Sequence, residues 1–276
     1  MSIEYESLKK KYFELFDGKL EYFDFIITDV LFAYKEISEI IKKQEIKRVL
    51  EVGCGTGILI RELKENFKDV DFTGLDPNQS GFHHYEKISE KILKLDKSIN
   101  INKCSIENFN FKGKYDLIFS FNVFEHVDNQ DEYILRTMSL LENKGLNIIF
   151  APNYDFPYEP HFLIPILLNK KLTKKIFRKR IENYESKNNE KGLWDALKFT
   201  GKSSIKKFLN KKNIDFEFDQ EIYDRMIKRA EEDKFFYKRQ GLAAKLAIFG
   251  KKIYLDKLIF NFLKIPHPYF KLTITK

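Results

Sequence analysis

Hydrophobic residues in the first 47 positions recur at the spacing of an α-helix. Leu8, Tyr12 and Leu15 are three or four positions apart, and residues 25–41 continue this pattern. Apolar side chains at this spacing share one face of a helix. We therefore expect residues 1–47 to form a helical cap that leads into the following domain.

From residue 48 to residue 151, short apolar runs alternate with stretches of helical periodicity. The run YDLIFSF is almost entirely apolar, as expected of a strand buried on both faces. Strands that alternate with helices predict a parallel, doubly wound α/β sheet. The predicted strands are 48–52, 70–75, 99–103, 115–121 and 145–151, and the predicted helices are 58–67, 79–95 and 130–141.

After Pro152 this alternation stops and later returns. A loop rich in proline and aromatic residues is followed by a basic helix and a polar stretch. A helix–strand pair then precedes further helices and a last strand, YFKLTITK. We interpret residues 48–276 as one domain with two helical insertions. The insertions are at about 152–200 and 220–266, the returning helix and strand are at 202–210 and 214–218, and the later helices fill about 220–263.

The composition supports a folded intracellular protein. Hydrophobic residues make up 43% of the 276 positions, enough for a packed core. The two cysteines, Cys54 and Cys104, form no disulfide framework, and the N-terminus lacks the pattern of a signal peptide. We therefore expect a cytoplasmic location. The most apolar region, 242–265, is interrupted by charged residues, which predicts an amphipathic helix and no membrane span.

The net charge of +8 raises the question of an anionic partner. Lysine far outnumbers arginine, whereas recognition of phosphates and guanines relies on the bidentate guanidinium group. Nucleic acid is therefore disfavoured as a partner. The run NKKLTKKIFRKR at 169–180 carries seven positive charges and is typical of a solvated helix face. The alternatives are an anion site and a peripheral contact with a membrane surface.

Three glycines follow the first predicted strand at every second position. Gly53, Gly55 and Gly57 end the segment VLEVGCGTG. Glycine tolerates positive φ and lacks Cβ, so a ligand can approach the main chain there. The next helix offers free N–H groups and the positive end of its dipole. Open α/β sheets bind ligands at such a turn, beyond the carboxyl ends of the strands.

The spacing of the glycines separates two classes of cofactor. The dinucleotide pattern G-x-G-x-x-G, begun at Gly53, requires glycine at position 58, where Ile58 stands. The actual pattern, Glu51-x-Gly53-x-Gly55-x-Gly57, resembles motif I of the class I methyltransferases that depend on S-adenosylmethionine (SAM). The resemblance covers 48–151 well and the last strands loosely. It implies a Rossmann-like sheet of seven strands and SAM as the cofactor.

The resemblance also implies roles for individual residues. Asp76, which closes the second strand, would accept hydrogen bonds from both ribose hydroxyls, although dinucleotide enzymes also place an acid there. In the segment KCSIENF, Ser105 and Ile106 would contact the adenine amine and ring. Glu51 would hold the SAM ammonium group. The predicted cofactor-binding set is Glu51, Gly53, Cys54, Gly55, Gly57, Asp76, Pro77, Ser105, Ile106, Phe121 and Asn122.

The candidate catalytic residues follow the fourth and fifth strands. Glu125 and His126 come soon after YDLIFSF, and His161 lies in the loop after the fifth strand. Because carboxyl ends of parallel strands share one crevice, we expect these side chains to meet near the methyl group of SAM. A hydroxyl acceptor must lose a proton, and histidine has a suitable pKa. Either His126 or His161 would be the base, oriented by Glu125 or Glu159.

Two other interpretations of this cluster are open. The spacing Asn122-x-x-Glu125-His126 resembles the E-x-x-E-H metal motif of small-RNA 2′-O-methyltransferases and ubiquinone-type O-methyltransferases. Asn122 replaces the first glutamate and removes one negative charge, so a divalent metal is an alternative and no metal ligand is assigned. In the third interpretation, the Glu-His pair caps a helix and packs near SAM.

The acceptor is expected to be a small polar molecule. The segment PNYDFPYEPHF resembles part of methyltransferases that modify cell-surface polysaccharides and other sugars. Aromatic rings stack on sugar faces, and Tyr, Asp and Glu bond hydroxyls; the other interpretation is a lid whose aromatic residues simply pack. We predict O-methylation of a sugar or surface-glycan precursor in polysaccharide biosynthesis. The alternatives are an N-methyltransferase, an RNA methyltransferase and a SAM-binding regulatory protein, and the helices at 220–263 allow a homodimer.

Overall fold

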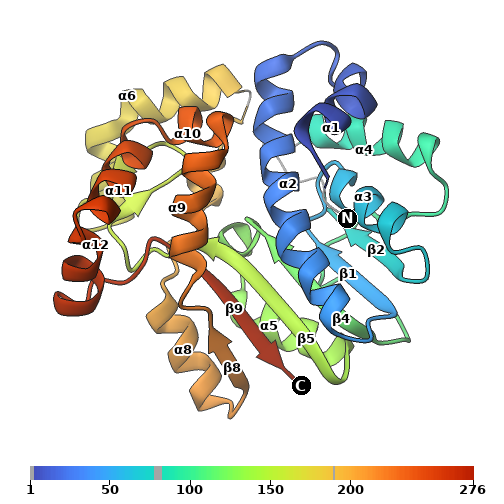
Figure 1. Cartoon of the computed structure of the whole chain (residues 1–276). Helices are drawn as coiled ribbons and strands as arrows, with labels where there is room; N and C mark the ends of the chain where they lie inside the picture. Colours follow the sequence, from blue (N-terminus) through green and yellow to red (C-terminus); the bar gives the residue numbers. More distant parts are fainter. Residues whose placement is uncertain (1–2, 78–82, 189) are drawn as a thin grey trace. The chain divides into compact units, whose positions relative to one another are not determined.

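Seven strands in the described part of the chain form one sheet in the order β3-β2-β1-β4-β5-β9-β8. The structure is a computed structural model that describes residues 3–77, 83–188 and 190–276 (Figure 1). Pairing is parallel between β1 and β2, between β1 and β4, and between β2 and β3. The strands are β1 (Arg48–Val52), β2 (Asp71–Leu75), β3 (Asn100–Asn102), β4 (Tyr115–Phe121), β5 (Leu141–Pro152), β8 (Asp215–Phe218) and β9 (Tyr269–Thr275).

This order confirms the predicted Rossmann-like α/β sheet of seven strands. The chain runs outward from β1 to β2 and β3, then returns to the other side of β1 with β4. Strand order therefore reverses beside β1, where open α/β sheets bind their ligands. The chain divides into two compact units. The first is 1–121, 131–148 and 275–276, and the second is 122–130 and 149–274.

The helices of the first unit agree with the predicted helical periodicity. In α2, the buried residues Phe23, Ile27, Val30, Ile37 and Ile41 recur at helical spacing. The four predicted positions 79–82 lie outside the described residues. The helices are α1 (Tyr5–Tyr12), the 3₁₀ turn η1 (Phe13–Phe16), α2 (Leu20–Lys43), α3 (Ile58–Asn66), α4 (His83–Leu95) and α5 (Gln130–Leu140).

A buried tyrosine joins the N-terminal segment to α3 within the first unit. Tyr12 is 0% exposed, and its hydroxyl donates to Glu62. Arg61 donates from Nη1 to the Tyr12 oxygen at 2.6 Å. Lys11 donates to Glu62 Oε1 at 2.7 Å. Burial, followed by the bond to Glu62, raises the pKa of Tyr12 above its usual range, so the phenol stays neutral and acts as a structural link.

The second unit holds both predicted insertions. The division into an N-terminal cap and a methyltransferase domain stays a prediction. Strands β6 (Tyr158–Glu159) and β7 (Ile164–Pro165) pair antiparallel. The helices are α6 (Lys170–Asn188), α7 (Leu193–Ala196), α8 (Lys202–Lys211), α9 (Ile222–Glu232), α10 (Lys234–Gln240), α11 (Leu242–Lys252), α12 (Leu255–Lys257) and the π-helical turn η3 (Leu258–Phe262).

Strand β5 begins earlier than the sequence predicts. It starts at Leu141, directly after α5, although the segment LENKG is typical of a turn. Lys144 has a φ of 67°, and its N–H donates to the carbonyl oxygen of Lys276 at 2.9 Å. Lys276 donates in return to Gly145 at 3.2 Å. The end of the chain thus supplies the hydrogen bonds that extend the strand.

Candidate functional site

The turn that joins β1 to α3 has a backbone suited to glycine. Gly53, Gly55 and Gly57 have φ angles of 76°, 51° and 75°, in the left-handed region that side chains disfavour. The N–H groups of Gly53 and Cys54 both donate to the Leu75 carbonyl oxygen, at 2.7 and 3.0 Å. The turn is therefore fastened to the end of β2, and α3 begins immediately after it.

Asp76 lies against this glycine turn. Its Oδ2 accepts a hydrogen bond from the Gly55 N–H at 2.8 Å. Its own N–H donates to the Asn102 carbonyl oxygen at 3.1 Å, which ties the end of β2 to the end of β3. The Asp76 side chain is partly exposed. The predicted ribose-binding carboxylate is thus fixed at the carboxyl ends of the strands.

Glu51 is a buried carboxylate at the same edge of the sheet. Its side chain is 5% exposed, and among the described residues Oε2 has no hydrogen-bond partner. Burial, followed by the charge of Asp76, raises the pKa of Glu51 to about 8. A buried acceptor without a donor is costly, and a bound cation would remove that cost. SAM carries an ammonium group and a sulfonium, so Glu51 fits this cofactor.

Three other predicted cofactor residues differ in exposure. Cys54 is 6% exposed, and burial raises the pKa of its thiol well above the usual value. The thiol therefore stays protonated and acts as a packing group. Pro77 is exposed, and Phe121 is partly exposed with its ring 5.7 Å from that of Phe32. Contacts of these residues with a cofactor stay predictions.

Ser105 and Ile106 lie in a short turn after β3. The hydroxyl of Ser105 accepts a hydrogen bond from Asn108 Nδ2 at 3.3 Å. Ile106 is 2% exposed, so its side chain belongs to the core of the unit. Arg136 fixes the turn by donating to the carbonyl oxygens of Ile106 and Phe109. Their predicted contacts with adenine remain predictions, with Ser105 as the more exposed of the pair.

Asn122 opens the second unit directly after β4. Its φ of 55° is in the left-handed region, which asparagine tolerates better than most residues. The Asn122 N–H donates to the Phe150 carbonyl oxygen at 3.0 Å. Its amide oxygen, Oδ1, accepts a hydrogen bond from the Tyr269 hydroxyl at 2.7 Å. This bond occupies an oxygen that the metal interpretation would use as a ligand.

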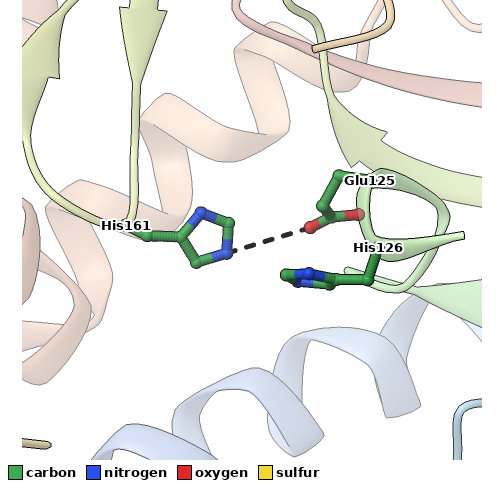
Figure 2. Close-up of side chains that lie close together, drawn as sticks. All are labelled: Glu125, His126 and His161. Carbon is green, nitrogen blue, oxygen red and sulfur yellow. Dashed lines mark ion pairs between the residues drawn. The ribbon is translucent and has the colours of Figure 1, made fainter. Parts of the chain in front are cut away.

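Glu125, His126 and His161 come together within the second unit, as the sequence predicts. Figure 2 shows His161 facing the other two residues, which lie side by side in the turn η2 (Phe124–His126). His161 Nε2 lies 3.9 Å from Glu125 Oε1. The two imidazole rings are 5.7 Å apart. One donor atom from each residue lies within 4.8 Å of the others.

A second carboxylate, Glu159, contacts the ring nitrogen of His161 that is not directed at Glu125. Glu159 is 0% exposed, and its Oε1 lies 2.7 Å from His161 Nδ1. Its Oε2 accepts the Phe162 N–H at 2.7 Å, and the Tyr154 hydroxyl donates to Oε1 at 3.3 Å. The Glu159 carboxylate is therefore fixed by its own hydrogen bonds, and it orients Nε2 of His161 toward Glu125.

The two histidines have opposite protonation states near neutral pH. Burial lowers the pKa of His161, but the charges of Glu159 and Glu125 and the bond to Glu159 outweigh it and raise this pKa to about 9. Burial, followed by the charges of His161 and Lys170, lowers the pKa of His126 to about 3. His161 is thus a cation and His126 is neutral at pH 7. Such divergence is typical of catalytic sites.

Glu125 has the properties of a proton acceptor poised near neutral pH. Its side chain is 2% exposed, and neither carboxylate oxygen has a hydrogen-bond partner among the described residues. Burial raises its pKa to about 7, although the positive charge of His161 opposes the rise. An O–H donor from a bound acceptor would satisfy this carboxylate. Of the three clustered residues, Glu125 thus has the pKa nearest neutrality and two unpartnered acceptor oxygens, while the predicted role of His126 or His161 as base stays a prediction.

Two residues that influence this cluster were not predicted to belong to it. Glu190 is 7% exposed, and its charge contributes to the raised pKa of His161. Lys170, which donates from Nζ to the Leu197 carbonyl oxygen at 2.6 Å, contributes to the lowered pKa of His126. Both belong to the first insertion, where Glu190 lies in no motif and Lys170 was singled out only as part of the basic run 169–180.

Three of the four polar residues predicted to bind a sugar have partners inside the second unit, and Tyr158 is the exception. Asp155 accepts hydrogen bonds from the N–H and hydroxyl of Ser203, at 2.7 and 2.8 Å, at the start of α8. The ring of Tyr154 stacks on Phe199 with centroids 4.5 Å apart. Glu159 orients His161. Tyr158 is half-buried, and its hydroxyl has no hydrogen-bond partner in the described structure.

Comparisons with known proteins show which family the region around the glycine turn matches. A family model described as "Methyltransferase domain" matches residues 50–146. An uncharacterized protein of Mycobacterium tuberculosis is 33% identical over 195 residues, which cover 70% of this chain and 66% of that protein. The ubiquinone biosynthesis O-methyltransferase of Rickettsia bellii is 28% identical over 131 residues, which cover 47% of this chain and 49% of that enzyme. The chain thus spans about half the length of this named relative.

Solved structures include a more distant likeness. The plantazolicin methyltransferase BpumL, in complex with a triazolic desmethylPZN analog and SAH, is 17% identical with a TM-score of 0.49. The likeness covers 97% of this chain and 90% of that one. A likeness with this TM-score is no evidence for the fold. The strand order establishes the fold by itself. The family match and the site geometry agree: residues 50–146 match a methyltransferase domain, and Glu51, the glycine turn and Asp76 within it have the arrangement that fits SAM.

Proposed function

We propose that this protein transfers the methyl group of SAM to a hydroxyl of a small polar acceptor. The first unit supplies the groups that fit the cofactor. Asp76 would accept the ribose hydroxyls, the glycine turn would lie against the carboxylate end, and Glu51 would compensate the ammonium charge. When bound, SAM supplies an activated methyl group on a sulfonium. The tasks left to the protein are to align the acceptor and to receive a proton.

The buried Glu125 carboxylate is the observation that supports a hydroxyl acceptor. Both of its oxygens lack hydrogen-bond partners among the described residues, so an acceptor O–H would find a ready proton acceptor. If the acceptor hydroxyl binds at Glu125, this carboxylate would receive the proton that the hydroxyl loses on methylation. The cation His161, oriented by Glu159, stabilises the Glu125 anion before the transfer. His126, which follows Glu125 in η2, remains neutral.

The acceptor class is the narrower part of the proposal. We favour a sugar or surface-glycan precursor, supported by the aromatic segment that carries His161 and by the unpartnered Tyr158 hydroxyl. The names of the relatives widen the range of acceptor classes to be tested. They include the ubiquinone biosynthesis O-methyltransferase and a malonyl-[acyl-carrier protein] O-methyltransferase of Ilyobacter polytropus, which is 36% identical over 101 residues covering 35% of each chain. Phenolic and carboxyl acceptors therefore belong in the same test.

The experiment is a methyl-transfer assay with isotopically labelled SAM and a panel of acceptors. The panel contains nucleotide-linked sugars, free sugars, simple phenols, carboxylates, amines and a generic RNA. We expect label on a hydroxyl, with transfer reduced at least about a hundredfold in Glu125→Gln while S-adenosylhomocysteine still binds. Label on an amine would contradict a hydroxyl acceptor, and label on RNA would contradict a small acceptor. Binding of S-adenosylhomocysteine without transfer to any acceptor would indicate a SAM-binding regulatory protein.

A metal-assisted version of the reaction is the second candidate. Two imidazoles and one carboxylate with donor atoms within 4.8 Å match the ligand types of a divalent transition metal. Glu159 behind His161 matches the carboxylate that commonly supports a metal-bound histidine. Glu125, His126 and His161 would hold the ion, which would polarise the acceptor oxygen. Unchanged turnover after EDTA treatment and dialysis would exclude the metal-assisted reaction. Loss of turnover that added Mn²⁺ or Zn²⁺ restores would support it, and Glu125 would then be a metal ligand instead of the base.

A further inference from the structure

Helix α11 carries a row of apolar side chains that face solvent. Leu242, Leu246, Phe249 and Ile253 are spaced by four, three and four positions, the spacing that usually marks the core side of a helix. Their exposed fractions are 70%, 61%, 59% and 52%. A solvated helix face normally carries polar residues at such positions. The exposed apolar row therefore indicates that this face binds a partner.

The same helix already packs on the protein through a different face. Ala244 is buried in a small cluster with Ala230 of α9 and Phe236 of α10, and Ile248 packs against that cluster. Helix α11 lies beside α9 and α10 within the second unit (Figure 1). The core contact of α11 is therefore complete without the exposed row. The row is an additional apolar feature of a helix that is already anchored.

The exposed apolar surface continues beyond α11. After Ile253 the chain turns at Tyr254, whose φ is 59°, and enters α12 and η3. Tyr254, Leu258, Phe262 and Leu263 are 66%, 47%, 77% and 54% exposed. We call the combined set the apolar surface. It comprises Leu242, Leu246, Phe249, Ile253, Tyr254, Leu258, Phe262 and Leu263. All eight lie on α11, α12, η3 and the residues that adjoin them, elements that contact one another in sequence order, and exposed apolar residues gathered in this way mark an interaction site.

Positive charge accompanies these apolar residues. Residues 238–265 contain seven basic side chains and one acidic one, Asp256. Asp256 lies 4.0 Å from Nζ of Lys251, so it offsets one of these seven positive charges and the segment keeps an excess of positive charge. The basic residues interleaved with the apolar surface include Lys245, Lys252, Lys257 and Lys264, and all four are exposed.

We propose that the apolar surface docks on an anionic lipid bilayer. The apolar side chains would enter the headgroup–acyl boundary, while the lysines pair with lipid phosphates. Lysine stems also extend along apolar surface and keep their charge in the headgroup layer. A second copy of the chain is less suitable, because pairing two such surfaces brings lysines against lysines. None of the helices in the described residues is long and apolar enough to cross a membrane, so the contact is with the bilayer surface.

Co-sedimentation with vesicles tests the proposal on the full chain. One vesicle type is phosphatidylcholine alone, and the other contains phosphatidylglycerol as well. We expect binding to the anionic vesicles, and at least about tenfold weaker binding to the neutral ones. Leu246→Ser/Phe249→Ser should weaken anionic binding by at least about tenfold, because it removes apolar area that enters the boundary. Both residues are exposed, so folding should be little affected.

Charge reversal provides the matched comparison. Lys245→Glu/Lys252→Glu should reduce binding to anionic vesicles by at least about tenfold. Lys42→Glu/Lys43→Glu makes the same change in net charge at exposed positions of α2 and should bind within about twofold of the parent protein. Equal losses in both double variants would mean that overall charge, and not this surface, attracts the membrane. That result would overturn the proposal.

Fluorescence locates the contact. Trp194 is the only tryptophan and is 1% exposed, so the parent protein should respond little to lipid. In Phe249→Trp we expect a blue shift and quenching by brominated lipid when anionic vesicles are added. Absence of both vesicle binding and quenching would overturn the proposal. So would dimerisation of the parent protein that is abolished by Leu246→Ser/Phe249→Ser without any vesicle binding, since the occupant would then be a second copy.

Discussion

Glu159, which is buried, and His161, whose side chain is 20% exposed, form a hydrogen-bonded pair with 2.7 Å between Oε1 and Nδ1. The second oxygen of Glu159 accepts the main-chain N–H of Phe162, so the carboxylate cannot turn away without losing that bond. The pair fixes the tilt of the His161 ring and leaves Nε2 directed at Glu125. The protonation of His161 therefore depends on Glu159, and so does the charge that acts on Glu125.

The first prediction concerns this dependence. In Glu159→Gln we expect the pKa of His161 to fall clearly from its value of about 9, because the carboxylate charge is lost while burial continues to oppose the cation. The pKa of His126 should rise, since a neutral His161 no longer repels its proton. NMR titration of labelled histidine measures both. Glu182→Gln, on an exposed side chain of α6, is the control, and an unchanged His161 pKa in Glu159→Gln would refute the pairing.

The second prediction concerns the pH dependence of methyl transfer. Because the pKa of Glu125 is raised to about 7, Glu125 holds a proton below this pH and cannot accept another. The rate should therefore rise as pH increases through about 7. It should fall again as His161 loses its proton near pH 9, since the charge beside Glu125 then disappears. In Glu125→Gln the residual rate of methyl transfer should no longer rise as pH increases through about 7. A rate that is constant between pH 6 and 8 would contradict this assignment.

The fold was largely predictable from the sequence because its signals are local. Strands β1 and β4 were predicted to the residue, since apolar runs buried in a parallel sheet have sharp ends at turns or charged residues. The early start of β5 was missed because the partner of Lys144 is Lys276, at the other end of the chain. Pairing between such distant segments leaves no signal in a short stretch of sequence.

The candidate site was predictable in part, for the same reason. The glycine turn and Asp76 follow from spacing and strand ends, and the contact between Glu125 and His161 follows from neighbouring strands. The choice among Glu125, His126 and His161 as base depends on burial and on charges such as that of Glu190. Burial is a property of the packed chain, so residue identity alone cannot supply the pKa values that distinguish them.

The third prediction concerns the cofactor. Asp76→Ala should weaken binding of S-adenosylhomocysteine by at least about tenfold, because one carboxylate would serve two ribose hydroxyls and also fixes the Gly55 N–H. Asp71→Ala, at the exposed start of the same strand, should leave the affinity within about twofold. Titration calorimetry measures both variants. Equal affinity in Asp76→Ala and the parent would remove the ribose assignment.

The fourth prediction separates backbone strain from steric overlap at the glycine turn. Gly57 and Gly18 have nearly the same φ, 75° and 73°. A Cβ atom on Gly18 would meet nothing within 4 Å, whereas one on Gly57 would lie 2.5 Å from Cδ1 of Ile101. Gly18→Ala should therefore lower the free energy of unfolding by about 1 kcal/mol, from the left-handed backbone alone. Gly57→Ala should cost about 1–3 kcal/mol more, because overlap with the Ile101 side chain is added.

Urea unfolding of the two alanine variants measures this difference within one compact unit. A third protein, Gly57→Ala/Ile101→Val, removes the methyl group that the new Cβ would contact. If overlap is the added cost, this double variant should recover part of the stability that Gly57→Ala loses, relative to Ile101→Val alone. Equal destabilisation in Gly18→Ala and Gly57→Ala would show that the neighbouring side chain moves aside freely. The requirement for glycine at position 57 would then come from its backbone conformation alone.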